Sequence, residues 1–178
     1  DLSVFAGRIS LNGEYDSSTQ VDLTNKAGQI WNVPEGRWAI TSFERVKDPG
    51  EQIDYLDSAA VAKFIEITHE EYFKRYGKHF GTTIPGIFFD EIYANLSKMG
   101  NNFFWTDDFF LKFRKLKGYD LQDKLPLILY NDPGKSEKVR YDYFDVVKEL
   151  YTNAWFKQYA DWCEKHHIWA TGHTAEKL

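Results

Sequence analysis

The amino-acid sequence predicts an α/β fold, specifically parallel β/α units of the partial (β/α)8 TIM-barrel type with a β-hairpin decoration at the N-terminal end. Two observations carry this prediction. After residue 36, strand-like and helix-like segments alternate, which is typical of parallel β/α units. The stretch Ile84–Phe89 is short and continuously apolar, as expected of a strand buried on both faces of a parallel sheet. We assign residues 1–36 to the decoration and 37–178 to the β/α units, within a single domain, 1–178.

The first 45 residues predict strands separated by turns. Asn12-Gly13 is a strong turn signal between two short apolar stretches. Alternation of polar and apolar residues indicates a strand at Gln20–Thr24, and Gln29–Val33 is expected as its return strand. After the turn at Pro34–Gly36, a further strand is expected at Trp38–Phe43, as the first strand of the β/α units.

Helix signals begin after residue 56. Asp57 or Ser58 is expected to cap a helix that runs to about Tyr76, and Gly77 fits the left-handed position after the last turn. The spacing of apolar residues in this segment marks one helical face.

Two further helices are expected, with a short one between them. Thr106 is the expected cap of the first, with acidic residues at positions 107 and 108 in its first turn and Gly118 at its end. A short helix within residues 120–130 is expected to be interrupted at Pro126. The last and longest runs from Ser136 to about His166, and residues 168–172 follow as another strand.

Composition narrows the class of protein. The 178 residues carry a net charge of −5, from 22 Lys and Arg against 27 Asp and Glu, and a nucleic-acid partner is therefore not expected. No apolar run is long enough to predict a membrane span. The single cysteine, Cys163, excludes an internal disulfide. The chain begins without Met or a signal peptide, and we expect it to be processed or cut from a longer protein.

Acidic residues follow two of the predicted strands. Asp90 and Glu91 come directly after Phe89, and Glu176 follows the strand at residues 168–172 together with His173. In β/α folds the chemistry lies at these carboxyl ends of strands. Glycoside cleavage needs two carboxyl groups, one to protonate the leaving oxygen and one to act as nucleophile or base. From the pattern alone, Asp90 could equally cap a turn and Glu91 could be a solvated residue.

Other patterns allow two interpretations each. The spacing of His173 and Glu176 suits either two metal ligands or a local hydrogen-bonded pair, and no third or fourth ligand is evident. Trp105, just before a predicted helix, suits either a platform for a sugar ring or a hydrophobic staple. Aromatic residues make up 17% of the chain, which fits both sugar binding and an ordinary core.

Several segments, in order along the chain, resemble landmarks of the bacterial family 106 glycoside hydrolases, the α-L-rhamnosidase-like proteins. The resemblance covers roughly residues 28 to 178. It is carried by Trp31–Trp38 (W-x-V-P-x-G-x-W), Ile53–Asp57 (D-Y-L-D), Thr68–Tyr72 (T-H-E-x-Y), Gly86–Glu91 (a strand with an acidic pair), Trp105–Phe109 (W-T-x-x-F), Gly118–Leu121 (G-Y-D-L), Leu125-Pro126 and Thr171–His173 with Glu176. In the last of these, the acid lies one residue closer than in the family pattern.

The resemblance implies a barrel hydrolase that acts on terminal, rhamnose-like sugars of plant or microbial polysaccharides by an inverting mechanism, often with calcium. By matching position, Glu91 would be the general acid, supported by Asp90, and Glu176 would be the second carboxylate. Residues that would hold the sugar are His173, Asp54, Tyr55 and, as a platform, Trp105.

The resemblance also implies a periplasmic or extracellular protein that is a fragment of a larger glycosidase catalytic domain. Only three to four β/α units are evident, which cannot close an eight-stranded barrel. We therefore expect the remainder of the parent chain as a partner, or a homodimer through an open sheet edge, and negligible turnover from the isolated chain. The alternative function is a non-catalytic carbohydrate-binding or scaffold domain of a cell-surface protein.

Overall fold

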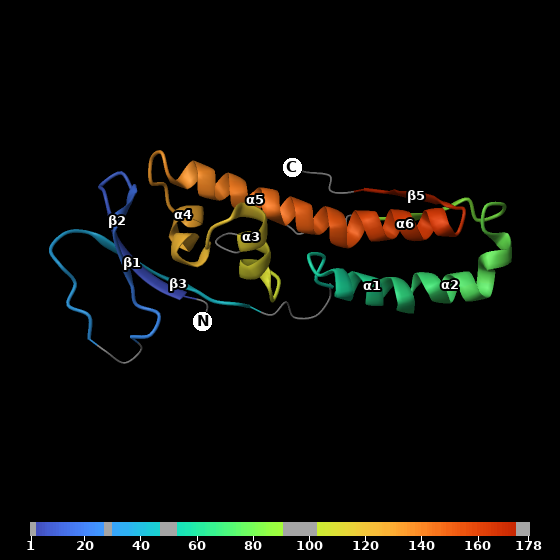
Figure 1. The fold of residues 1–178 in the computed structure, drawn as a ribbon, viewed down its shortest axis with the longest axis horizontal. Coiled ribbons are helices and arrows are strands. Elements are labelled where there is room, and N and C mark those ends of the chain that lie inside the picture. Colours follow the sequence, from blue (N-terminus) through green and yellow to red (C-terminus); the bar gives the residue numbers. More distant parts are fainter. Residues whose placement is uncertain (1–2, 27–29, 47–52, 91–102, 174–178) are drawn as a thin grey trace. The chain divides into compact units, whose positions relative to one another are not determined.

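The computed structural model of the chain describes residues 3–26, 30–46, 53–90 and 103–173 (Figure 1). Glu91 and Glu176 lie outside the described residues. The chain divides into two compact units: unit 1 comprises residues 1–48 and 107–146, and unit 2 comprises residues 49–106 and 147–178.

Unit 1 contains a three-stranded antiparallel sheet with the strand order β2-β1-β3. The strands are β1 (Ser3–Ile9), β2 (Tyr15–Asp22) and β3 (Trp38–Phe43). A turn with Gly13 at φ +82° joins β1 to β2, which confirms the predicted hairpin because glycine adopts this left-handed backbone without strain. The predicted strand at Gln20–Thr24 overlaps the second half of β2.

Two predictions for this region are wrong. Residues 30–33 form no strand. Ile30 is 92% exposed, so the segment buries no apolar face that would stabilise strand pairing. The segment instead leads into a loop in which the indole N–H of Trp38 donates to the Pro34 carbonyl over 3.0 Å. Strand β3 pairs antiparallel with β1, with Arg8 opposite Trp38, and is therefore not a strand of a parallel β/α unit.

The helices of unit 1 are α3 (Phe109–Lys117), α4 (Leu125–Leu129) and the first part of α5 (Ser136–Tyr151), with a 3-10 turn, η3 (Gln122–Lys124), before α4. Fully buried side chains from α3 and α5 form the core of this unit. The rings of Phe109 and Tyr143 lie 5.4 Å apart. Apolar residues at helical spacing are thus buried in this core, as the sequence predicted.

The predicted start of α3 is two residues early. The helix begins at Phe109, after Asp108, whose carboxylate forms an ion pair with Lys112 (2.7 Å) instead of capping the backbone. Thr106 is buried and precedes the helix. The end is as predicted, with Gly118 left-handed at φ +78°. Pro126 lies in the first turn of α4 and does not interrupt it, because its missing N–H falls where no intrahelical bond is made.

Unit 2 begins with α1 (Ser58–Ile67) and α2 (His69–Tyr76), which the sequence predicted as one helix. Asp57 caps α1, as predicted, by accepting a hydrogen bond from the Ala59 N–H (2.8 Å). Thr68 divides the two helices, and its hydroxyl donates to the Phe64 carbonyl over 2.6 Å. The prediction for Gly77 is wrong: its φ is −56°, because the chain continues into a 3-10 turn, η1 (Gly77–His79).

The long helix predicted from Ser136 to about His166 is confirmed, with one irregularity. A π-helical turn, η4 (Thr152–Lys157), links α5 to α6 (Gln158–Lys165). The strand β5 (Trp169–Gly172) follows and pairs in parallel with β4 (Gly86–Phe89). The described residues thus confirm a mixed α/β fold with a parallel pair, and a partial TIM barrel remains a proposal.

An aromatic core holds unit 2 together. The rings of Trp155 and Tyr159 stack 5.6 Å apart, and Phe89 packs edge-on against Tyr159 at 5.1 Å. The Tyr159 hydroxyl donates to the Ile87 carbonyl over 2.8 Å. Cys163 is a buried core residue, as predicted, and burial raises the pKa of its thiol to about 11. This packing fixes β4 against α6.

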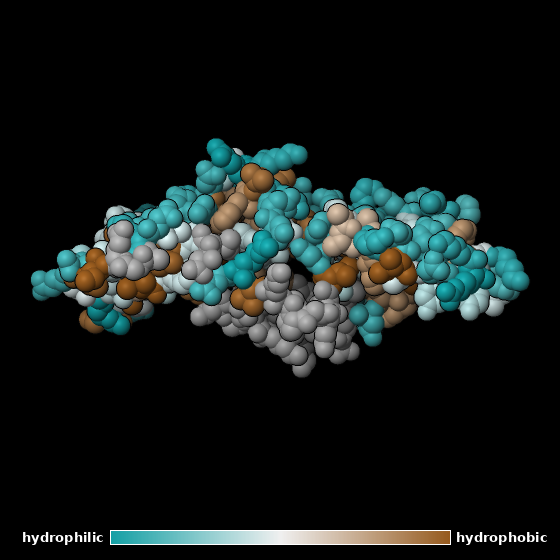
Figure 2. All heavy atoms as spheres, turned by 90° about the horizontal axis from the view of Figure 1, so that it is seen from below, coloured by the Kyte–Doolittle hydropathy of each residue, from teal (hydrophilic) through white to brown (hydrophobic). Residues whose placement is uncertain are grey.

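The outer surface of the described residues is largely polar. On the face drawn in Figure 2, hydrophobic residues form separate patches among hydrophilic ones. Among the described residues, no helix combines the length and apolar character needed to cross a membrane.

The stability of unit 2 should depend on pH through His69. Burial lowers the pKa of its imidazole below the ordinary value of 6.5. The unfolded chain then takes up a proton at a higher pH than the folded chain does, so stability is fully present above about pH 6.5 and is lost as pH falls towards the folded pKa. We expect the free energy of unfolding, measured with urea, to fall between about pH 6.5 and pH 5.

The variant His69→Phe is the matched control, because it keeps an aromatic ring between Phe64, Tyr159 and Trp162 but does not titrate. Its free energy of unfolding should change less over the same pH interval. An equally steep change in the variant would show that His69 is not the responsible group.

Candidate functional site

The parallel pair of β4 and β5 places two strand ends at one edge of a sheet. The pairing is in register from Gly86 opposite Trp169 to Phe89 opposite Gly172. Both strands end there, and the chain leaves β4 at Asp90 and β5 at His173. Asp90 and His173 thus follow two strands, as the sequence predicted, and the structure shows that these strands are neighbours.

Asp90 and His173 are in contact at these strand ends. The imidazole Nδ1 of His173 lies 3.4 Å from a carboxylate oxygen of Asp90, and the backbone N–H of His173 donates to the Phe89 carbonyl over 2.9 Å. The Phe88 ring packs edge-on against the imidazole at 5.1 Å. Both side chains are exposed, at 74% for Asp90 and 58% for His173, which leaves them open to a ligand and makes their ion pair weak.

Tyr55 lies in the aromatic core beneath β4. Its ring packs edge-on against Trp155 at 5.3 Å, and Trp155 in turn contacts Phe89, the last residue of β4. Burial raises the pKa of the Tyr55 hydroxyl. Tyr55 is thus linked to the strand end through Trp155.

Asp54 has a local role in the described structure. One of its carboxylate oxygens accepts a hydrogen bond from the Leu56 N–H (2.9 Å), which shapes the turn before α1. Its second oxygen accepts no hydrogen bond from the described residues. Asp54 can therefore serve the turn and still offer an acceptor to a sugar hydroxyl.

The remaining predicted site residues are less defined. Trp105 is half-buried and belongs to unit 2, and no described contact brings it to Asp90 or His173. Glu91 and Glu176, the two carboxylates on which the catalytic assignment depends, lie outside the described residues. The structure thus brings together Asp90 and His173, links Tyr55 to the strand end only through Trp155 and Phe89, and leaves the roles of all seven residues as proposals.

A metal site is not formed by the described residues. No three His, Cys, Asp or Glu side chains gather among them in a way that could hold an ion. Asp90 and His173 alone make a pair, and an imidazole is not a ligand that calcium prefers. The calcium that the family resemblance implies stays an expectation, and Glu176, the second ligand considered beside His173, lies outside the described residues. No catalytic step is derived through either metal.

Sequence analysis missed the residues that support the site. Tyr159 holds β4 through its hydrogen bond to Ile87, and Phe88 orients His173. Tyr159 was evident only as one member of a helical apolar stripe, which is the pattern of any core residue. A tyrosine at such a position carries a hydroxyl that needs a partner, and this is the signal that could have pointed to a hydrogen bond in the core.

Comparison with known proteins shows the family of the chain. The sequence profile of glycoside hydrolase family 106, alpha-L-rhamnosidase, matches residues 12–178. The chain belongs to this family. Membership confirms the resemblance seen in the ordered sequence landmarks, and it makes the chain part of a glycosidase-type enzyme family.

Two longer proteins are similar to this family 106 chain. The structure of the rhamnosidase from Novosphingobium sp. PP1Y matches 89% of the chain with a TM-score of 0.57 at 21% identity, which shows a shared fold. A putative beta-glucuronidase of Formosa agariphila is 25% identical over 80% of the chain. The chain spans 17% of the former protein and 13% of the latter.

The close approach of the two strand ends should make Gly172 sensitive to substitution. A Cβ atom at this position would overlap the ring and the carbonyl oxygen of Phe89. We expect Gly172→Ala to destabilise unit 2 by about 1–3 kcal/mol, a typical cost of overpacking, in urea unfolding followed by tryptophan fluorescence. Thr171→Ala, at the exposed neighbouring position, is the control and should change stability far less. Equal effects of the two variants would contradict the close packing.

Proposed function

We propose that this chain supplies the acid-bearing strand ends of a glycosidase active site. The observation that carries the proposal is the parallel, in-register pairing of β4 with β5, from which the chain continues to Glu91 on one side and to Glu176 on the other. Two carboxylic acids that follow adjacent strand ends in the sequence suit glycoside cleavage, in which one acts as acid and the other as base or nucleophile.

In this proposal the roles follow from position. Glu91 is the general acid that protonates the leaving oxygen, and Glu176 is the second carboxylate. Asp90 supports Glu91 and contacts His173, which with Asp54 and Tyr55 holds the sugar. Trp105 offers an aromatic face to the ring. The exposure of Asp90 and His173 supports this arrangement, because groups that meet a substrate must be reachable.

The proposed substrate is a terminal, rhamnose-like sugar of a plant or microbial polysaccharide. Family membership supports this class of substrate. The Formosa agariphila relative is named a putative beta-glucuronidase, so a glucuronide is the alternative substrate, and it would be cleaved by the same acid–base chemistry. A periplasmic or extracellular location follows from such a substrate, because polysaccharides of this kind are met outside the cytoplasm.

We further propose that a longer parent chain completes the site. The relatives are several times longer than this chain, and the described residues supply no third strand to the β4–β5 sheet. The 178-residue chain alone should therefore show negligible hydrolysis, and its open sheet edges are where a second copy could pair. Robust glycosidase activity of a monomer, with its mass checked by light scattering, would contradict this proposal.

Substitution of the two carboxylates tests the catalytic assignment. In the parent protein, Glu91→Gln and Glu176→Gln should each lower kcat for an α-L-rhamnoside by at least about 100-fold, the lower range for loss of acid–base catalysis. Glu137→Gln, an exposed residue of α5, is the matched control and should retain activity. Hydrolysis that survives both active-site substitutions would favour the non-catalytic, carbohydrate-binding alternative.

The mechanism makes a geometric prediction as well. In a structure of the complete protein, the carboxyl groups of Glu91 and Glu176 should lie about 6.5–9.5 Å apart if the reaction inverts the anomeric centre, and about 5–5.5 Å apart if it retains it. A separation beyond about 12 Å would break the pairing of these two residues.

A further inference from the structure

Unit 1 contains a cavity that the strand-end site does not use. Its volume is about 360 Å³, which falls in the range of small-ligand sites, and it lies between the β1–β2 hairpin and the turn before α5. Its lining combines polar and apolar side chains: Arg8, Ile9, Ser10, Glu14, Tyr15, Asp16, Asp132 and Pro133. All of these residues belong to unit 1, so the cavity is defined within one compact body.

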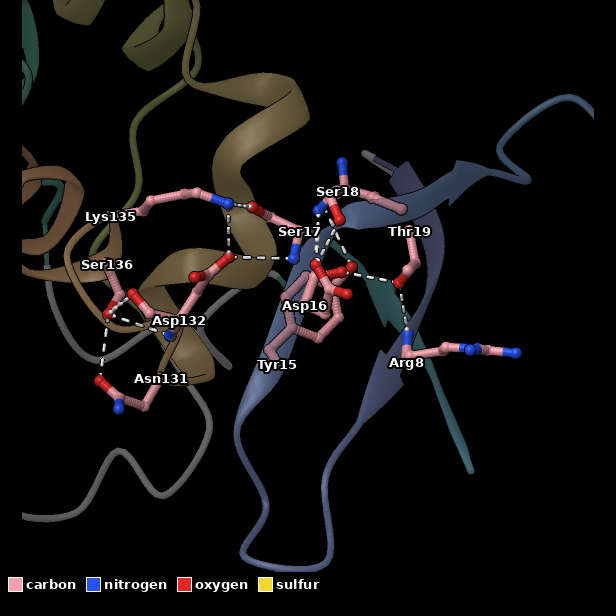
Figure 3. A network of polar contacts seen from close by, with 11 residues as sticks. Arg8, Tyr15, Asp16, Ser17, Ser18, Thr19, Asn131, Asp132, Lys135 and Ser136 are labelled. Atoms are coloured by element: carbon pink, nitrogen blue, oxygen red, sulfur yellow. Dashed lines mark hydrogen bonds and ion pairs between the residues drawn. The ribbon is translucent and has the colours of Figure 1, made fainter. Parts of the chain in front are cut away.

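The walls of the cavity are fastened to each other by hydrogen bonds (Figure 3). The backbone N–H of Tyr15 donates to the Asn131 carbonyl over 2.7 Å, and that of Ser17 donates to the Asp132 carboxylate over 2.9 Å. Lys135 joins both sides, at 2.9 Å from the Ser17 hydroxyl and 3.3 Å from Asp132. Because these hydrogen bonds already order the walls, a ligand would bind without the loss of conformational entropy that ordering them would require.

Several polar atoms of the lining can form further hydrogen bonds. Within the described residues, the Glu14 carboxylate accepts no hydrogen bond, and Asp16 uses only one oxygen, which accepts from the N–H (3.0 Å) and hydroxyl (2.5 Å) of Ser18. The Ser10 hydroxyl accepts from the Glu14 N–H (3.1 Å) and retains its own proton to donate. Acceptors and a donor thus stand side by side at the rim.

Arg8 adds donors next to an apolar surface. One guanidinium N–H donates to the Glu35 carbonyl over 2.7 Å, and the group lies over the Trp38 ring at 5.6 Å. These contacts hold the guanidinium in place and leave most of its five N–H donors available. Ile9 and Pro133 provide apolar faces in the lining. The Tyr15 ring is buried and stacks on Tyr130 at 5.4 Å, so Tyr15 supports the wall from the core.

We propose that this cavity binds one neutral sugar ring of a polysaccharide, as an accessory subsite. Carboxylates accept from sugar hydroxyls, the guanidinium and serine donate to them, and the apolar faces meet ring C–H groups. The lining carries three carboxylates and one guanidinium, and among the described residues the Lys135 ammonium pairs only with the carboxylate of Asp132, so negative charge remains in excess and an acidic sugar is disfavoured. The subsite does not rest on hydrolysis by Glu91 and Glu176, since binding here needs neither residue.

Nuclear magnetic resonance of the ¹⁵N-labelled 178-residue chain tests this proposal. Titration with D-galactose or L-rhamnose should shift the amide signals of Ser10, Glu14, Tyr15 and Asp16 in a saturable way. D-Galacturonate, which differs from galactose by its carboxylate, should bind at least about tenfold more weakly, the effect of one unfavourable charge contact. Shifts caused by calcium chloride alone, or no saturable shift with either neutral sugar, would overturn the proposal.

Substitution at the rim gives an independent check. Glu14→Ala should weaken binding of the neutral sugars about tenfold, the typical loss of one hydrogen bond to a charged group, without unfolding the chain, because the side chain is exposed. Glu137→Ala, an exposed acid of the same unit outside the lining, should leave the affinity unchanged. Equal affinities of the Glu14 variant and the unsubstituted chain would contradict the site, whatever the outcome for Glu91 and Glu176.

Discussion

The packing of Phe89 and Ile87 onto the helix behind them is the interaction on which the candidate site depends. Tyr159 contributes twice, because its ring packs edge-on against Phe89 and its hydroxyl satisfies the Ile87 carbonyl. Trp155 extends the same contact to Tyr55. A strand of four residues is too short to be stable alone, so its position is fixed by this aromatic core. The position of Asp90 at the strand end therefore depends on this packing.

The two units illustrate different ways of presenting polar groups. In unit 2, Asp90 and His173 project from strand ends and are exposed, while the aromatic core beneath them carries the stability. In unit 1, Asp132 is buried, and hydrogen bonds from Ser17 and Lys135 hold it between the hairpin and the turn. Exposed groups suit contact with a substrate that comes and goes, whereas a cross-linked wall suits a preformed subsite.

Sequence reasoning succeeded where one local cause decided the structure. Gly13 and Gly118 are left-handed, Asp57 caps a helix, and the apolar run before Asp90 is a parallel strand. The expected burial of this strand on both faces is wrong for the described residues, because Phe88 is 53% exposed. Sequence reasoning failed where partners distant in sequence decided. Strand β3 joined an antiparallel sheet because β1, which lies before the whole of β2 in the chain, offered a matching edge. The start of α3 was misplaced for a local reason instead, since the Asp108 carboxylate pairs with Lys112 four residues later.

The candidate site was predictable to a similar degree. Membership of family 106 followed from motifs whose order along the chain was visible. The contact of Asp90 with His173 was not predicted, because the sequence does not show which two strands are neighbours. The support from Tyr159 was not predictable, because a hydroxyl that reaches the backbone of a strand many residues away leaves no periodic trace. The cavity of unit 1 was missed for the same reason, since its walls come from residues 8–16 and 132–133.

The π-helical turn at Thr152–Lys157 changes the direction in which the side chains of α6 point around the helix axis. One extra residue in a turn rotates the later positions by about 100° relative to an uninterrupted α-helix. Trp155 lies within the turn and Tyr159 just beyond it, and both face β4. Trp155 and Tyr159 are four residues apart and would share a face of an uninterrupted α-helix as well. The offset instead acts across the turn, where it brings Tyr151 before it and Tyr159 beyond it onto the same core.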